Sequence, residues 1–360
     1  MKDMPAFDLP SANAPRGPIP RRVPPGTVPL IAVEGDAYDC GRHYAEIVRE
    51  RYPRHRTYLD QAHAWSAVAG HVKRLYERHA PHLLAVFRGL SEGAGPATGA
   101  SVPPPPGGCT SFGVSGTVTL DGQPISGQTK DPGIEKIPLY VALRMRIKDA
   151  PTILVLAYPG EVLGYGLWST GMSIFRNSLY STAGADTGLT MEQWGPLALA
   201  GSSVHDAVEL AHRHGISSAG NCLISDSGGQ SLSVEFNAGG VNVVPARDGI
   251  AAHGNHPEGA ETSPLDAYAD HEGPSERENS RYRMRGLWHL LNAERGRLTP
   301  PRAMMILADH TYYPQGICRH WVEGRPEMET TAAVVAEPTE GRLHVVRGQP
   351  CANWPTTYTI

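Results

Sequence analysis

The sequence predicts an α+β fold built in layers, because three kinds of local pattern follow one another along the chain. A segment with helical periodicity comes first, short β-type runs separated by turns come next, and further helical segments follow. A regular alternation of strands and helices would instead favour a doubly wound parallel sheet. We therefore expect antiparallel strands packed against helices, in a chain of 360 residues whose 40% hydrophobic content suffices for a full core.

The first helical segment is expected between residues 38 and 93. Apolar side chains recur there at spacings of three and four residues, for example at Tyr44, Ile47 and Val48, while Arg, Glu and His fill the other faces. The pattern ends at residues 93–108, which are too rich in glycine and proline to continue a helix. We expect this stretch to be an exposed, extended linker with polyproline character.

The β-type runs and the later helices are expected after residue 108. Short apolar and β-branched runs bounded by turns predict strands at 117–120, 141–147, 152–158 and 232–236. Helical spacing predicts helices at 203–214, 280–291 and 301–309, with Ser203 as the cap of the first. The sequence has no internal repeat, no glycine-rich dinucleotide motif after a strand and no Walker loop. A nucleotide-binding fold is therefore not expected.

Composition and charge narrow the classes of partner. A net charge of -4 gives no electrostatic reason to expect nucleic acid or an anionic membrane as the main partner. No segment reaches the roughly 18 apolar residues of a membrane span, and the proline-rich residues 1–29 lack the apolar core of a secretory signal. The five cysteines are scattered and odd in number, so a fully paired disulfide framework is not expected. We expect a cytoplasmic protein with a small-molecule partner.

The junction between Gly108 and Cys109 is the strongest candidate for chemistry. A cysteine that becomes a new amino terminus carries its own base, because the freed α-amine sits beside the thiol. Gly107 and Gly108 give the backbone the freedom that self-cleavage needs. The Cys109 thiolate would attack the Gly108 carbonyl in an N-to-S acyl shift, and water would then hydrolyse the thioester. The alternative is a flexible proline-glycine loop with an ordinary cysteine.

Further motifs follow this junction in a fixed order. They are Gly127-Gln128-Thr129-Lys130-Asp131, Ala252-His253-Gly254-Asn255-His256, Asp309-His310 and Gly316-Ile317-Cys318-Arg319-His320. With Gly-Cys-Thr before them, these motifs resemble those of the N-terminal-nucleophile cysteine hydrolases, a family typified by fungal isopenicillin N acyltransferase that also includes the insect β-alanyl-dopamine hydrolase. The similarity extends from about Gly35 to the end of the chain.

The resemblance implies a four-layered αββα sandwich made from a precursor that cuts itself before Cys109. After a proline-rich tail at 1–29, residues 30–108 would form a helical α chain, and residues 109–360 the catalytic β chain. The two chains would stay together as one compact domain, an αβ heterodimer with or without further oligomerisation. No cofactor, nucleic acid or membrane is expected as a partner.

The resemblance also implies transfer of an acyl group onto the cysteine. Discharge to water would hydrolyse a linear amide bond of a small N-acyl or aminoacyl compound. Discharge to an amine would instead make the protein an acyltransferase, with acyl-coenzyme A or an amide as the donor. Hydrolysis is the leading expectation, and acyl transfer the alternative.

Four residues match catalytic positions of the family. Cys109 matches the nucleophile, and its matured α-amine the base. Asp131 matches the acid that orients this amine or steadies the scissile loop. Asn255 matches the side-chain amide that donates a hydrogen bond to the oxyanion, a role worth about 3 kcal/mol where such donors have been removed. Arg319 matches an arginine whose fork could hold a substrate carboxylate or pair with Asp131.

Each of these matches has an ordinary structural alternative. Asp131 and Asn255 also suit turns, and Arg319 also suits a structural salt bridge. Thr110, Lys130 and His256 are added as candidates for oxyanion or substrate binding, the first through its backbone N–H. Relatives often carry Asn-Trp where this chain has Thr129-Lys130, and a serine is common where it has Gly316. The change to Thr129-Lys130 bears on which substrate the pocket accepts, and the change to Gly316 bears on the geometry of the loop before Arg319.

Two other classes of function were weighed against an enzyme with a cysteine nucleophile. His253, His256, His310 and His320, with Asp309, are the best-clustered candidates for metal ligands in the sequence. Their spacing matches neither His-Glu-x-x-His nor paired Cys-x-x-Cys motifs, so no metal is expected. A non-catalytic binding module could use the proline-rich head to dock a partner. That role leaves the ordered set of catalytic matches without an explanation.

Overall fold

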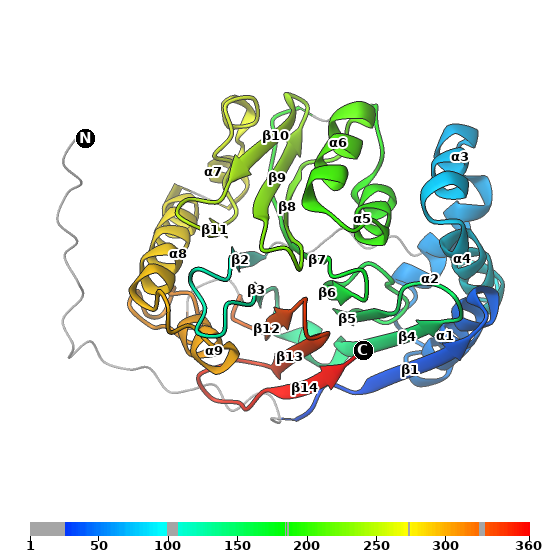
Figure 1. Ribbon diagram of the computed structural model, residues 1–360, viewed down its shortest axis with the longest axis horizontal. Coiled ribbons are helices and arrows are strands. Elements are labelled where there is room, and N and C mark those ends of the chain that lie inside the picture. Colours follow the sequence, from blue (N-terminus) through cyan, green and yellow to red (C-terminus); the bar gives the residue numbers. More distant parts are fainter. Residues whose placement is uncertain (1–25, 99–106, 184, 186, 273, 324–327) are drawn as a thin grey trace.

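Two β-sheets stacked face to face form the centre of the molecule, and helices cover both outer faces (Figure 1). The computed structural model describes residues 26–98, 107–183, 185, 187–272, 274–323 and 328–360. Most of the expected tail at 1–29, and half of the linker expected at 93–108, lie outside the described residues. The layer order is helix, sheet, sheet, helix, so the predicted αββα sandwich is confirmed.

The larger sheet has eight strands in the order β1-β4-β5-β6-β7-β8-β9-β10. Strand β1 pairs parallel with β4, and every other pair in this sheet is antiparallel. The strands are β1 (Leu30–Gly35), β4 (Val141–Ile147), β5 (Ile153–Ala157), β6 (Tyr165–Trp168), β7 (Ser173–Asn177), β8 (Gly220–Ser225), β9 (Ser231–Asn237) and β10 (Gly240–Pro245).

The smaller sheet has six antiparallel strands in the order β11-β2-β3-β12-β13-β14. Strand β2, which contains Cys109, lies between β11 and β3 and is buried along its whole length. The strands are β11 (Ile250–His253), β2 (Gly108–Val114), β3 (Ile125–Asp131), β12 (Ala332–Glu337), β13 (Arg342–Arg347) and β14 (Thr356–Thr359).

Helices cover the outer face of each sheet (Figure 1). Over the larger sheet lie α1 (Ala37–Arg51), α2 (Thr57–Ala62), η1 (His63–Ala67), α3 (Gly70–His79), α4 (Pro81–Gly93), α5 (Met191–Ala200) and α6 (Val204–His214). The smaller sheet is covered by α8 (Pro274–Ala293), preceded by α7 (Tyr268–Glu272), and by α9 (Pro300–Leu307). Two short 3-10 turns, η2 (Ile134–Leu139) and η3 (Ser263–Leu265), complete the elements. Among the described helices, none is long and apolar enough to cross a membrane.

Three apolar layers hold these elements together. Tyr44 and Trp168 belong to the layer between the first helices and the larger sheet. Phe175 and Val334 belong to the layer between the two sheets. Phe112 packs in the third layer, under α8 and α9. Because both faces of each sheet are covered, many strands are apolar on both sides and do not alternate in the sequence.

Most of the predicted elements are confirmed within a few residues. The strand predicted at 141–147 is β4, and Ser203 caps α6 by accepting a hydrogen bond from the backbone N–H of Asp206 (3.1 Å). The strand predicted at 117–120 is wrong. That segment turns between β2 and β3, and only Thr119 makes a bridge, to Leu298. The segment at 30–108, expected to be helical, also begins with strand β1.

Candidate active site

Cys109 lies near the start of β2, where the antiparallel register places it opposite Lys130 of β3. Gly108 pairs with Asp131 in the same register, so the junction is held in a strand and is no flexible loop. The Cys109 side chain is buried and borders a cavity of about 230 Å³. The strand thus presents the sulfur to a space that can accept a small molecule.

Asn255 follows β11 and contacts the backbone nitrogen of Cys109. The Cys109 N–H donates a hydrogen bond to Asn255 Oδ1 (2.9 Å), and Asn255 Nδ2 donates to the Ser178 carbonyl (3.1 Å). Ser178 borders the same cavity as Cys109. In the uncut chain, the side-chain oxygen of Asn255 therefore holds the atom that cleavage would convert into an α-amine.

The loop that carries Asn255 is fixed by Glu235, a buried residue of β9 that the sequence did not indicate. Its carboxylate accepts hydrogen bonds from His253 Nε2 (2.6 Å) and from the backbone N–H groups of Glu258 (2.7 Å) and Gly259 (2.9 Å). Burial raises the pKa of Glu235, but these hydrogen bonds, led by that of His253, outweigh burial and lower it to about 2. Glu235 thus stays ionised and organises the loop.

Helix α8 contributes a stripe of polar side chains on its inner face. Asn279, Ser280 and Arg283 follow Glu276 by three, four and seven residues, so the four side chains lie on one side of the helix. Ser280 Oγ accepts a hydrogen bond from the Asn255 backbone N–H (2.6 Å). This stripe, on a helix predicted correctly, is the main part of the site that sequence reasoning missed.

Arg283 makes the closest contacts of this stripe with the junction. Its Nη1 donates to the Cys109 carbonyl (2.8 Å) and to Thr110 Oγ1, and its Nη2 donates to Asn255 Oδ1 (2.9 Å). Its Nε donates to Asn279 Oδ1 (2.8 Å), which completes a fully buried fork. One guanidinium thus joins the predicted nucleophile to the predicted amide.

Asp131 and Arg319 meet at Gly108. A Cβ atom built on Gly108 would lie 2.8 Å from Arg319 Nη1 and 3.0 Å from Asp131 Oδ2, so no side chain fits there. Both of those atoms are buried, and neither has a hydrogen-bond partner among the described residues. Thr330 Oγ1 links the two residues, because it accepts from the Arg319 N–H (2.8 Å) and donates to Asp131 Oδ1 (2.8 Å).

The charges around Asp131 are partly balanced. Burial raises the pKa of Asp131, and the nearby Arg283 and Arg319 oppose that rise. Arg319 itself forms its ion pair with Glu276 of α8 (2.9 Å), where the sequence suggested a pair with Asp131. Asp131 and Arg319 thus both lie beside Gly108, as the sequence suggested, but the ion pair of Arg319 is with Glu276.

Lys130 contacts the predicted nucleophile directly. Its Nζ lies 3.5 Å from Cys109 Sγ and 3.9 Å from the centre of the Tyr165 ring. Burial lowers the pKa of Lys130, but the nearby Cys109 and Tyr165 outweigh burial and raise it above its usual value. A charged ammonium at this distance stabilises negative charge on sulfur. Lys130 is thus a neighbour of the sulfur as well as a residue of the cavity wall.

Aromatic residues form much of the rest of the wall. Tyr58, Tyr158 and Tyr165 line the cavity, and Tyr58 stacks on Tyr158 with the ring centres 6.1 Å apart. A second cavity of about 300 Å³ shares Tyr58, Gln61 and Glu192 with the first, and its other walls are mostly apolar. A mostly apolar cavity therefore adjoins the space beside Cys109 at these three residues.

Thr110 and His256, the two remaining candidates, are not among the described residues that line the cavity, whereas Lys130 is. The Thr110 side chain is bound by Arg283, and His256 Nδ1 lies 2.8 Å from Ser280 Oγ. Burial lowers the pKa of His256, although Glu258 beside it acts in the opposite direction. His256 thus contacts Ser280, the same side chain that binds the Asn255 backbone.

Comparison with known protein families decides the relationship. Residues 139–352 match the model of the family described as acyl-coenzyme A:6-aminopenicillanic acid acyl-transferase, which is more than half of the chain. The protein belongs to this family. The acyl-transferase family match contains Asn255, Arg283 and Arg319, whereas Cys109 and Asp131 precede it and are located by the structure alone. The resemblance seen in the sequence is thereby confirmed, and the protein is an enzyme of this class.

Other comparisons are more distant. No curated protein sequence matches the chain. Among solved structures, a mutant of conjugated bile acid hydrolase from Clostridium perfringens is 12% identical, with a TM-score of 0.47 over 70% of this chain and 97% of that one. Penicillin V acylase from Agrobacterium tumefaciens is 16% identical, with a TM-score of 0.45 over 70% and 86%. At these values, the likeness assigns neither an activity nor a substrate to this chain.

Proposed function

We propose that the protein is a self-processing cysteine hydrolase that cleaves a linear amide bond through a thioester on Cys109. One observation carries this proposal. Three atoms of Cys109 are each bound by a different side chain: the nitrogen by Asn255, the carbonyl oxygen by Arg283 and the sulfur by Lys130, at the edge of a cavity. A merely structural cysteine needs no such set of partners.

Maturation would cut the chain between Gly108 and Cys109. The thiolate attacks the Gly108 carbonyl carbon, the C–N bond breaks as the nitrogen takes a proton, and Gly108 is left as a thioester on the sulfur. Water hydrolyses this thioester to a carboxylate and restores the thiol. Asp131 Oδ2 and Arg319 Nη1, both without a partner among the described residues, are close enough to Gly108 to bind the groups formed there.

The mature site would then act on a substrate amide. The neutral α-amine takes the proton of the thiol, and the thiolate, next to the Lys130 ammonium, attacks the substrate carbonyl. We assign the oxyanion to Asn255 Nδ2, because this amide donates to the carbonyl of Ser178, a residue that borders the cavity, and so lies near the space for substrate. The amine product leaves with a proton, and water discharges the acyl group.

The walls of the cavity support an apolar or aromatic acyl group as the part of the substrate that is recognised. Tyr58, Tyr158 and Tyr165 offer ring faces near the sulfur, and the adjoining chamber is mostly apolar. Glu192 is available at the junction of the two cavities for a cationic group. We therefore propose small N-acyl compounds as the substrate class.

Acyl transfer is the second candidate, and the paired cavities favour it. Two adjoining cavities offer separate room for an acyl donor and an amine acceptor, whereas hydrolysis needs only one substrate and water. Incubation of the mature protein with acyl-coenzyme A and a panel of amines distinguishes the two functions. Formation of an amide product faster than hydrolysis assigns acyl transfer, and its absence across the panel assigns hydrolysis.

Mass spectrometry of the denatured wild-type protein tests the proposal. We expect two chains, the second beginning at Cys109, and activity against members of a panel of N-acyl amines. Cys109→Ala should remain a single uncut chain without activity, and Cys109→Ser should cut slowly. A single intact chain in fully active wild-type protein would contradict self-processing, and full activity of Cys109→Ala would contradict the nucleophile.

A cytoplasmic location is part of the proposal. All five cysteines are unpaired in the structure, including Cys351 at the surface. Free thiols, and a thiol nucleophile in particular, persist in a reducing compartment.

A further inference from the structure

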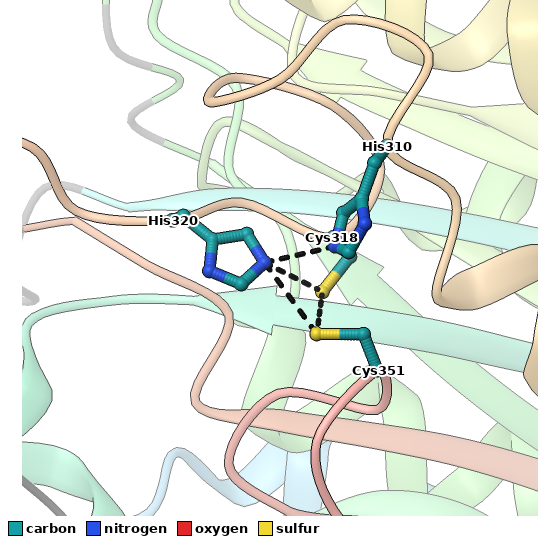
Figure 2. Close-up of side chains that lie close together, drawn as sticks. All are labelled: His310, Cys318, His320 and Cys351. Atoms are coloured by element: carbon teal, nitrogen blue, oxygen red, sulfur yellow. Dashed lines mark hydrogen bonds between the residues drawn. The ribbon is translucent and has the colours of Figure 1, made fainter. Parts of the chain in front are cut away.

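A second cluster of reactive side chains shares no hydrogen bond with Cys109 among the described residues. It consists of His310, Cys318, His320 and Cys351, and Figure 2 shows the four side chains converging on one point. One ligand atom of each residue lies within 4.8 Å of those of the other three. Among the described residues, this is the one group of three or more His, Cys, Asp or Glu side chains that could hold a metal ion.

Four of the six distances between ligand atoms lie close to the edges of a tetrahedron around one ion, and all six are within 4.8 Å. With Zn–S bonds of about 2.3 Å and Zn–N bonds of about 2.05 Å, the edges are about 3.8 Å for S–S, 3.6 Å for S–N and 3.3 Å for N–N. The two sulfurs are 3.6 Å apart, and His320 Nε2 lies 3.7 Å from Cys318 Sγ and 3.5 Å from Cys351 Sγ. The two Nε2 atoms are 2.9 Å apart. Small shifts of the rings complete the match.

The ligands come from two segments that the fold brings together. His310, Cys318 and His320 lie between α9 and β12, and Cys351 lies between β13 and β14. The first segment is braced by backbone hydrogen bonds from the Cys318 N–H to the Asp309 carbonyl (3.1 Å) and from the His320 N–H to the Pro314 carbonyl (2.8 Å). Cys318 and His320 are buried, whereas His310 and Cys351 are exposed, so the cluster reaches from the interior to the surface.

We propose that His310, Cys318, His320 and Cys351 bind one zinc ion that ties these two segments together. Two thiolates and two imidazoles in a tetrahedron are the ligand set that favours zinc among the common divalent ions. Binding converts both thiols to thiolates and releases two protons to solvent. Four protein ligands leave no open position, so the ion is structural. This proposal stands independently of the proposed function.

The zinc ion would also orient Arg319, which lies between two of its ligands. Arg319 extends from this loop to Glu276 of α8 and to the space beside Gly108. An ion bound on both sides of Arg319 fixes the backbone from which the guanidinium starts. The site thus links the C-terminal segment to the junction before Cys109, with Arg319 as a positioning residue.

A disulfide between Cys318 and Cys351 is the competing use of these sulfurs. Its S–S bond of about 2.05 Å would require the sulfurs to approach from their present 3.6 Å. It would also leave the two histidines beside the sulfurs without a function. The two states exclude each other, because sulfur in a disulfide is no longer a thiolate ligand.

Elemental analysis of the full-length protein, purified without a histidine tag or chelator, tests the proposal. We expect one zinc per chain. After removal of zinc with a chelator under reducing conditions, titration with Co²⁺ should give the strong visible bands of tetrahedral cobalt and sulfur-to-cobalt charge-transfer bands. Absence of zinc together with absence of these bands in folded, reduced protein would overturn the proposal, as would a Cys318–Cys351 disulfide in protein isolated under reducing conditions.

Variants locate the ion. Cys351→Ser should weaken zinc binding by at least about 100-fold, since even indirect contacts to a metal are worth 10- to 100-fold. His310→Gln, at an exposed ligand, provides a second variant if the first does not fold. Cys40→Ser is the matched control, because that thiol donates only to the Gly35 and Arg146 carbonyls, and its zinc content should equal that of wild type. Full zinc binding by both ligand variants would place the ion elsewhere.

Discussion

Gly108 is defined by the absence of space around its α-carbon. Arg319 Nη1 and Asp131 Oδ2 occupy the positions that any side chain would need, and both are charged groups held from other elements. A residue with a Cβ would have to displace at least one of them. The residue before the proposed nucleophile is therefore restricted to glycine by packing as well as by backbone freedom.

Gly108→Ala should slow maturation by at least about tenfold, since overpacking of a tight site costs roughly 1–3 kcal/mol. The measurement is the fraction of cut chain over time after translation, by mass spectrometry. Gly107→Ala is the matched control, because its Cβ would meet Pro132 Cα at 3.3 Å and no charged group. Equal rates of cutting in the two variants would contradict the role of this contact.

Lys130 differs from Lys136, the other lysine of the same wall, by its contact with the Cys109 sulfur. Lys130→Met should lower kcat/KM by about 100-fold or more, since it removes a buried charge that stabilises the attacking thiolate. Lys136 lines the same cavity but pairs with Glu135 at 3.8 Å, so Lys136→Met should change mainly KM. Steady-state kinetics on matured protein measure both effects, and an equal loss in the two variants would refute a special role for Lys130.

At the scale of elements, helix α8 is the part that assembles the site. Its inner face binds the Asn255 backbone through Ser280, the Cys109 carbonyl through Arg283 and Arg319 through Glu276. These contacts join three separate segments to one rigid helix. The geometry of the junction thus depends on residues that never touch the cavity.

Arg283→Gln should slow maturation by about tenfold or more while the fold is retained, because Cys109 and Asn255 each lose a buried charged donor. Arg285→Gln, on the exposed face of the same helix, should cut at the wild-type rate. Comparison of cut fractions, with circular dichroism and Tm as controls of folding, tests this positioning role. An unaffected rate in folded Arg283→Gln would show that the contact is dispensable.

The same helix shows what a sequence can and cannot predict. Its spacing predicted a helix at 280–291, and α8 contains that segment. The partners of Arg283 could not be predicted, because Cys109 is 174 residues away along the chain. Strand β2 was missed for another reason: all its residues are buried, so it lacks the alternation by which strands are recognised. Thr110 and Lys130 were both identified from motifs. Only the fold shows that Lys130 lines the cavity whereas the Thr110 side chain is bound by Arg283.

At the scale of the whole molecule, stability should depend on pH through buried carboxylates. The folded-state pKa of Glu235, about 2, lies below the usual value near 4.3 because of hydrogen bonds led by that of His253. The ionised carboxylate therefore stabilises the fold above about pH 4.3, and this contribution is lost as the pH falls toward 2. Its full size is roughly 3 kcal/mol.

Urea unfolding at a series of pH values measures this contribution. We expect the unfolding free energy of Cys109→Ala, which stays a single chain, to fall between pH 5 and 2. The double variant with Glu235→Gln should be less stable at neutral pH and should lose less on acidification. An equal pH dependence in both proteins would contradict the assignment.

The αββα layers themselves were predictable from the resemblance, since the family confirmed here implies them. The proposed zinc site was indicated only in part, because His310 and His320 were among the metal candidates of the sequence whereas Cys318 and Cys351 were not, and His253 belongs to another network. Spacing along the chain reveals metal sites only when the ligands share a loop or a helix. Here three ligands share the segment between α9 and β12, and the fold brings Cys351 to them from the segment between β13 and β14.

Strand β1 and the helices α1 and α4 precede the junction, yet they pair with β4 and cover the larger sheet. If the Gly108–Cys109 bond is hydrolysed as proposed, these elements belong to a separate molecule with respect to folding. The newly made chain folds in a unimolecular process, whereas the mature enzyme, once denatured, must find its other half by diffusion. Recovery after denaturation then depends on concentration, and dilution alone favours loss of the enzyme.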